Sequence, residues 1–169
     1  MDHADPPEEA QFTLLVAELA KCLVEKHWTV ATAESCTGGW IAKCCTDLAG
    51  SSAWFERGYV TYSDAAKQEM LGVPAEILAT EGAVSSSVAL LMAQGARQRA
   101  GAHAALSVTG IAGPGGGSAE KPVGTVCFGW CLQGQETSSE VMRFKGGRDA
   151  VRRQTVNHAM LGLLARLRG

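Results

Sequence analysis

The fold of this chain is indicated by residues 28–40, Trp28-Thr-Val-Ala-Thr-Ala-Glu-Ser-Cys-Thr-Gly-Gly-Trp40. The apolar run at its start predicts a strand over residues 28–34, and residues 37–48 predict a helix. Ser35 therefore lies where a strand ends and a helix begins, beside Gly38 and Gly39. Backbone can come close to a ligand there and present free N–H groups to it. Such a turn is a common position for a nucleophile next to an oxyanion or phosphate site.

The segments around this turn alternate between helical and extended patterns. Helices are expected at residues 10–26, 37–48, 65–71, 74–79, 85–100 and 148–168, and strands at 28–34, 53–62, 104–109, 123–132 and 136–144. Gly58 inside the second strand suggests a bulge, and the last two strands suggest an antiparallel hairpin. The pattern predicts an α/β fold, a three-layer α/β/α sandwich with a mixed, mostly parallel sheet. We expect a single domain over residues 10–169, preceded by a disordered tail at residues 1–9.

The composition argues against several function classes. The net charge of -2 over 169 residues provides no global positive field for nucleic acid or an anionic membrane. Residues 1–9 lack the apolar core of a signal peptide, and no apolar run reaches the ~20 residues that span a bilayer. We therefore expect a cytoplasmic protein with no nucleic-acid or membrane partner.

Cysteine and histidine spacing gives no support for a metal site. The six cysteines form no Cys-x-x-Cys pair, and the four histidines are scattered without His-x-x-x-His spacing. In a cytosolic protein such cysteines are usually small buried hydrophobic residues. We expect neither a metal nor a cofactor.

A serine nucleophile needs a base, and no histidine lies at a convincing position. A lysine can serve if burial lowers its pKa enough for it to be neutral. The lysines considered are Lys21, Lys26, Lys43, Lys67, Lys121 and Lys145. Lys67 falls on the short helix expected at residues 65–71, right after a strand that ends in Tyr62, so it can face the same sheet edge as Ser35. Spacing alone nevertheless favours an exposed helix lysine.

Two other segments are open to two interpretations each. The glycine-rich residues 110–122 follow a strand and are either a connector or a cradle of backbone amides for a phosphate or ribose. A glycine pair before Arg148 opens the last helix, with Arg152 one turn further on. These arginines suit a phosphate, but they could equally pair with surface carboxylates.

Several motifs, all in order along residues 10–168, resemble one family. They are Ala33-Glu-Ser-Cys-Thr-Gly-Gly39, Gly58-x-Val-x-Tyr62-x-x-x-x-Lys67, Thr109-Gly-Ile-Ala-Gly-Pro-x-Gly-Gly117, Lys121-Pro-Val-Gly-Thr125-Val and Phe144-x-Gly-x-Arg148. The chain is similar to the nicotinamide-nucleotide amidases, whose domain also forms the C-terminal part of the competence/damage-inducible protein CinA.

The resemblance implies hydrolysis of nicotinamide mononucleotide (NMN) to nicotinate mononucleotide and ammonia, without a metal or cofactor, by a homo-oligomer. It implies a catalytic serine–lysine pair assisted by tyrosine: Ser35, Lys67 and Tyr62. We expect the oxyanion and the substrate to be held by residues of three segments: Thr37, Gly38, Gly39, Thr109, Gly110, Gly113 and Arg148. The rival hypotheses are a non-catalytic nucleotide-binding or regulatory module, and an amidase for another pyridine or phosphoribosyl amide.

Overall fold

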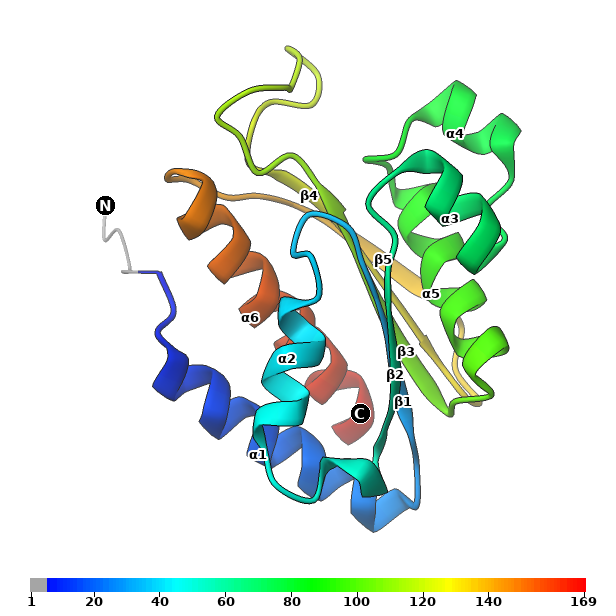
Figure 1. The fold of residues 1–169 in the computed structure, drawn as a ribbon, viewed down its shortest axis with the longest axis vertical. Helices are drawn as coiled ribbons and strands as arrows, with labels where there is room; N and C mark the ends of the chain where they lie inside the picture. Colours follow the sequence, from blue (N-terminus) through cyan, green and yellow to red (C-terminus); the bar gives the residue numbers. More distant parts are fainter. Residues whose placement is uncertain (1–5) are drawn as a thin grey trace.

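A five-stranded sheet separates two layers of helices in the computed structural model, which describes residues 6–169 (Figure 1). The strands are β1 (Val30–Glu34), β2 (Phe55–Val60), β3 (Ala104–Gly110), β4 (Thr125–Leu132) and β5 (Ser138–Arg143). The helices are α1 (Glu9–Lys26), α2 (Trp40–Asp47), α3 (Asp64–Leu71), α4 (Ala75–Glu81), α5 (Ser86–Ala100) and α6 (Arg148–Arg168), with a short 3-10 turn η1 (Ser51–Ala53). Helices α1, α2 and α6 cover one face of the sheet, and α3, α4 and α5 cover the other (Figure 1).

The sheet has the strand order β2-β1-β3-β4-β5. Strand β1 is parallel to β2 and to β3, whereas β4 is antiparallel to both β3 and β5. Four of the five strands, all except β4, therefore run in one direction. This confirms the predicted three-layer α/β fold with a mixed sheet and a C-terminal hairpin.

The ends of the expected elements shift slightly. Helix α1 begins at Glu9, one residue inside the expected tail, and residues 1–5 of that tail lie outside the described residues. The bulge of β2 was predicted at the wrong residue. The register slips between Phe55 and Arg57, so Glu56 is the extra residue, while Gly58 pairs regularly with Thr32.

Gly58 has a different physical role. A Cβ at this position would lie 2.9 Å from Thr32 Oγ1 and 3.1 Å from the Ala42 side chain. The glycine is therefore required by the close packing of β1 and α2 against β2, and not by a bulge.

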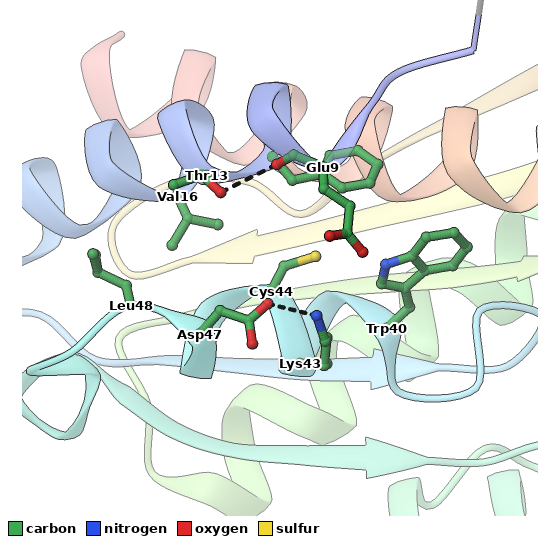
Figure 2. A pocket seen from close by; sticks show the side chains of 9 residues that line it. Glu9, Thr13, Val16, Trp40, Lys43, Cys44, Asp47 and Leu48 are labelled. Carbon is green, nitrogen blue, oxygen red and sulfur yellow. Dashed lines mark hydrogen bonds and ion pairs between the residues drawn. The ribbon is translucent and has the colours of Figure 1, made fainter.

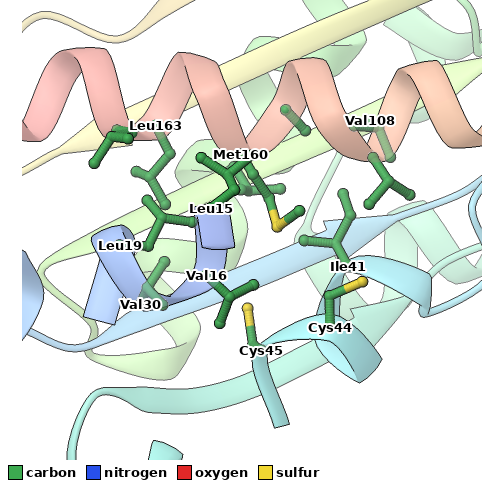
Figure 3. Close-up of a cluster of buried hydrophobic side chains, with 14 of the residues drawn as sticks. Leu15, Val16, Leu19, Val30, Ile41, Cys44, Cys45, Val108, Met160 and Leu163 are labelled. Atoms are coloured by element: carbon green, nitrogen blue, oxygen red, sulfur yellow. The ribbon is translucent and has the colours of Figure 1, made fainter. Parts of the chain in front are cut away.

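Two apolar cores flank the sheet. The larger one lies between the sheet and α1, α2 and α6, and it contains Val16 of α1, Val30 of β1 and Met160 of α6 (Figure 3). The second core joins β1 to α3, α4 and α5, with Ala31 and Ala33 facing it. Side chains of a strand alternate between faces, so β1 is buried on both sides. Among the described residues, no helix is both long and apolar enough to cross a membrane.

This architecture brings three chain segments to one edge of the sheet. Strands β1, β2 and β3 are parallel, so their carboxyl ends lie together. Ser35 follows β1, Tyr62 comes shortly after β2, and Thr109 and Gly110 end β3. The carboxyl ends of parallel strands are where open α/β sheets bind ligands.

Candidate functional site

Ser35 and Lys67 meet at this edge. Lys67 Nζ lies 3.1 Å from Ser35 Oγ, although 32 residues separate them in the sequence. Ser35 is held at the end of β1, where its N–H donates to the carbonyl of Val108. Lys67 reaches it from α3, whose first turn is capped by the Ser63 hydroxyl. The serine–lysine pair predicted from the motifs is thus formed by the fold.

The surroundings of Lys67 suit a neutral amine. Its side chain is almost entirely buried, at 1% relative exposure, and burial lowers the pKa of the ammonium below its ordinary value. Among residues 6–169, no carboxylate lies within ion-pair distance of it. Besides Ser35, its only hydrogen-bond partners there are the carbonyls of Thr61 at 2.9 Å and Tyr62 at 3.2 Å.

Those two carbonyls set the direction of the lone pair. A neutral amine has two N–H bonds, and the carbonyls of Thr61 and Tyr62 can accept both. The lone pair then points at Ser35 Oγ and can take its proton. The expected exposed lysine is excluded, and the geometry is that of a general base.

Tyr62 contacts Lys67 in a different way from the one expected. Its backbone carbonyl accepts the hydrogen bond from Lys67, while its side chain is 64% exposed. The phenol hydroxyl has no hydrogen-bond partner among the described residues. Tyr62 is among the residues that line the cavity next to Ser35, and the catalytic role that the resemblance implies for it stays a prediction.

A buried carboxylate organises the turn after Ser35. Glu34 Oε1 accepts hydrogen bonds from the Thr37 hydroxyl at 2.7 Å and from Ile41 N–H at 2.8 Å, and Oε2 accepts one from Ala42 N–H at 3.0 Å. The carboxylate therefore caps α2, where its charge also favours the helix dipole. Burial raises the pKa of Glu34, and the hydrogen bonds from Ile41 and Thr37 partly oppose this.

Gly38 and Gly39 allow the chain to enter α2 from this turn. Their φ angles are 61° and 99°, in the left-handed region that favours glycine. Gly38 N–H donates to the Ser35 carbonyl at 3.1 Å, and Gly39 N–H faces the Glu34 carboxylate. Gly38 N–H therefore already has an acceptor within the turn, and the expectation that Gly38 and Gly39 hold an oxyanion stays a prediction. In the described part of the turn, the N–H groups of Cys36 and Thr37 are the ones left without an acceptor from another residue.

A cavity of about 160 Å³ opens beside the serine–lysine pair. Thr109 and Gly110 of β3 line it on one side, and Arg148 lines it from the start of α6. The complete lining is Ser35, Cys36, Tyr62, Lys67, Ala83, Val84, Thr109, Gly110, Ala112 and Arg148. It combines small apolar groups with a serine hydroxyl, a lysine amine, a tyrosine and an arginine.

Thr109 and Gly113 support this cavity through the backbone. Thr109 Oγ1 donates to the carbonyl of Ala83 at 2.8 Å and so fastens the opposite wall. Arg148 Nη1 donates to the carbonyl of Gly113 at 2.7 Å, which ties the glycine-rich loop to α6. Gly113 is not among the residues that line the cavity.

The cysteine beside the nucleophile is not a rival to it. Burial raises the pKa of Cys36 to about 12, so the thiol stays protonated near neutral pH. Among residues 6–169, no group of three His, Cys, Asp or Glu side chains is placed to hold a metal ion.

A second cavity, of about 90 Å³, lies between α1 and α2 (Figure 2). Trp40 and Cys44 line it from α2, and Glu9 and Val16 line it from α1. It contains none of the predicted site residues. The residues that the sequence predicts for the site thus lie at the sheet edge and not in this second cavity.

Sequence reasoning missed two residues of the site. Glu34 was quoted only as part of the motif, although its place at the end of an apolar strand signalled burial. For Arg152 the sequence suggested a phosphate or a surface carboxylate as the partner, and no carboxylate pairs with it within residues 6–169. Its Nε donates to the Cys36 carbonyl at 3.0 Å, and its Nη2 donates to the Thr37 carbonyl at 3.2 Å.

Comparison with known proteins agrees with this architecture. Residues 13–167 match the family model of the CinA C-terminal domain, and the chain belongs to that family. The crystal structure of a competence/damage-inducible protein, CihA, from Agrobacterium tumefaciens has a TM-score of 0.91 to it at 46% identity, covering 96% of this chain and 98% of that one.

Curated relatives carry more specific names. The chain is 52% identical over 152 residues to the nicotinamide-nucleotide amidohydrolase PncC of Escherichia coli K12, covering 90% of this chain and 92% of that protein. It is 56% identical over 140 residues to the protein of the same name from Enterobacter agglomerans, covering 83% and 85%. A CinA-like protein of Akkermansia muciniphila is 52% identical over 142 residues, 84% of this chain but 34% of that longer protein.

Proposed function

We propose that this chain hydrolyses the carboxamide of NMN to nicotinate mononucleotide and ammonia, as the names of its amidohydrolase relatives indicate for those proteins. The observation that carries the proposal is the 3.1 Å contact between Lys67 Nζ and Ser35 Oγ, with Lys67 buried and in no ion pair among residues 6–169. This is the nucleophile and base arrangement that an acyl-transfer reaction without histidine requires.

In the first half of the reaction, neutral Lys67 takes the proton of Ser35 while Oγ attacks the carboxamide carbon. The oxyanion that forms accepts hydrogen bonds from the free N–H groups of Cys36 and Thr37. Lys67, now an ammonium, gives its proton to the departing nitrogen, and ammonia leaves. A nicotinoyl ester of Ser35 remains.

In the second half, water attacks the ester carbonyl and Lys67 accepts a proton from that water. The same two N–H groups hold the second oxyanion. The Ser35–acyl bond then breaks, the serine regains its proton from Lys67, and nicotinate mononucleotide is released. No cofactor takes part in either half, because amide hydrolysis transfers only protons and an acyl group.

The substrate is held by the rest of the cavity. Arg148 supplies the positive charge for the 5′-phosphate, and the exposed ring of Tyr62 covers the pyridine ring at the mouth. Gly110 lines the cavity, and its lack of a side chain is required by close packing against Val126 of β4. Thr109 and Gly113 act through the wall and loop that they fasten.

Ammonia release from NMN tests the proposal. The Ser35→Ala and Lys67→Ala variants are expected to fall to the background rate near neutral pH, while Ser52→Ala, an exposed serine of η1, keeps the wild-type rate. Retained turnover in Ser35→Ala would remove the nucleophile assignment. Binding of NMN to the wild-type protein without ammonia release would instead favour a nucleotide-binding module, and release only from related amides would favour a different substrate.

A further inference from the structure

The N–H groups of Cys36 and Thr37 are the two proposed oxyanion donors. The direction of each depends on what binds the backbone carbonyls of the turn after Ser35. In a trans peptide unit the C=O and the N–H point in opposite directions. The Gly113–Pro114 bond is the one cis peptide in the described chain, so the peptides of residues 35–38 are trans. A group that binds a carbonyl here therefore also sets the direction of the next residue's N–H.

The Cys36 N–H is oriented from within the turn. It belongs to the same peptide unit as the Ser35 carbonyl, which accepts the hydrogen bond from Gly38 N–H at 3.1 Å. This contact closes the turn on itself. No side chain is needed to orient this first donor.

The Thr37 N–H is oriented from outside the turn. It shares a peptide unit with the Cys36 carbonyl, and that carbonyl accepts from Arg152 Nε at 3.0 Å. Arg152 Nη2 also donates to the Thr37 carbonyl at 3.2 Å, so the guanidinium binds two successive carbonyls. Arg152 belongs to α6 on one face of the sheet, while Lys67 approaches from α3 on the other face (Figure 1). The Thr37 N–H is thereby directed away from α6.

Arg152 is itself fixed in place, and it is separate from the catalytic cavity. Its guanidinium lies 5.3 Å from the centre of the Trp40 ring, and it pairs with no carboxylate in residues 6–169. Arg148, one turn earlier, lines the cavity, but Arg152 does not. The two arginines, one helical turn apart, therefore have different surroundings: Arg148 lines the cavity, whereas Arg152 binds the turn after Ser35.

We propose that Arg152 is a positioning residue of the oxyanion site: it directs the Thr37 N–H by holding the Cys36 and Thr37 carbonyls. This inference rests on the proposed function, since it assumes that an oxyanion forms at this turn. A lysine cannot replace Arg152, because an ammonium is a point donor without the planar fork that spans two carbonyls.

Steady-state kinetics of Arg152→Lys with NMN test the proposal. We expect kcat to fall toward the about 100–1,000-fold loss that follows removal of one oxyanion donor, with KM nearly unchanged. Arg153→Lys is the matched control, because Arg153 lies 5.1 Å from the same Trp40 ring but binds Asp149 and no carbonyl of the turn. It is expected to keep the wild-type kcat.

The ratio of kcat for the carboxamide and for a thioamide analogue distinguishes loss of an oxyanion donor from partial unfolding, because unfolding lowers both rates equally. Sulfur accepts hydrogen bonds weakly, so replacing the carboxamide oxygen of NMN by sulfur lowers the wild-type kcat when the donors are aligned. In Arg152→Lys this oxygen-to-sulfur ratio is expected to shrink toward one. If the lysine variant does not fold, Arg152→Gln, whose amide can still donate to one carbonyl, is measured in the same way.

Two results would overturn the proposal. If Arg152→Lys raises KM and keeps the wild-type kcat, Arg152 contacts the charge of the substrate. If the variant lowers kcat but leaves the ratio of kcat for the oxygen and sulfur substrates unchanged, Arg152 does not act on the oxyanion. Failure of the proposed function is distinguishable from both, since the wild-type protein would then release no ammonia from NMN.

Discussion

Under the proposed mechanism, the site is active only when Lys67 has lost its proton. Burial lowers the pKa of Lys67 from its ordinary 10.5, and the nearby Asp64 charge partly opposes the shift. We therefore expect kcat/KM for NMN to rise with pH through this lowered pKa, as the amine becomes neutral.

Lys67→Arg is expected to lose activity at every pH, because a guanidinium keeps its proton. Initial rates of ammonia release across pH check this, with Lys43→Arg, an exposed lysine paired with Asp47, as the control. Activity in Lys67→Arg would contradict the base assignment.

At the scale of elements, the entry into α2 depends on one buried carboxylate. Glu34→Gln would replace one acceptor oxygen by an NH₂ group that faces N–H donors of Ile41 or Ala42. A buried group left unsatisfied costs about 1–3 kcal/mol, so the free energy of unfolding should fall by that amount. Asp47→Asn, at the exposed end of the same helix, should change it by less than about 1 kcal/mol. Urea unfolding of both variants measures the difference, and equal losses would show that Glu34 is no more than a surface cap.

The elements themselves were predictable, and the contacts between them were only partly so. Helical and alternating patterns are local, so they predicted α6 and the β4–β5 hairpin closely. The 3.1 Å meeting of Ser35 and Lys67 depends on how β1 and α3 pack, and spacing alone favoured an exposed lysine. The motifs identified the pair because they carry this long-range information. The double contact of Arg152 with the turn spans more than 100 residues, and no local pattern encodes it.

At the scale of the whole molecule, the lowered pKa of buried Lys67 makes stability depend on pH. The unfolded chain holds the Lys67 proton up to about pH 10.5, but the folded chain releases it at a lower pH. Between these two values the unfolded state binds more protons, so folding becomes more favourable as pH rises. The slope from this one group is at most about 1.4 kcal/mol per pH unit.

The difference in unfolding free energy between the wild-type protein and Lys67→Met measures the contribution of Lys67 titration to the pH dependence of stability. Methionine leaves the carbonyls of Thr61 and Tyr62 without their amine donor, but that loss is the same at every pH. All other titrating groups contribute nearly equally to both proteins and cancel in the difference. We therefore expect the free energy of unfolding of the wild-type protein to increase relative to that of the variant as pH rises from the lowered pKa toward 10.5. At lower pH the difference between the two proteins should be constant. Urea unfolding at a series of pH values measures it. A difference that stays flat across this window would mean that folding leaves the pKa of Lys67 unchanged, and the amine would then be protonated at neutral pH and unable to serve as the base.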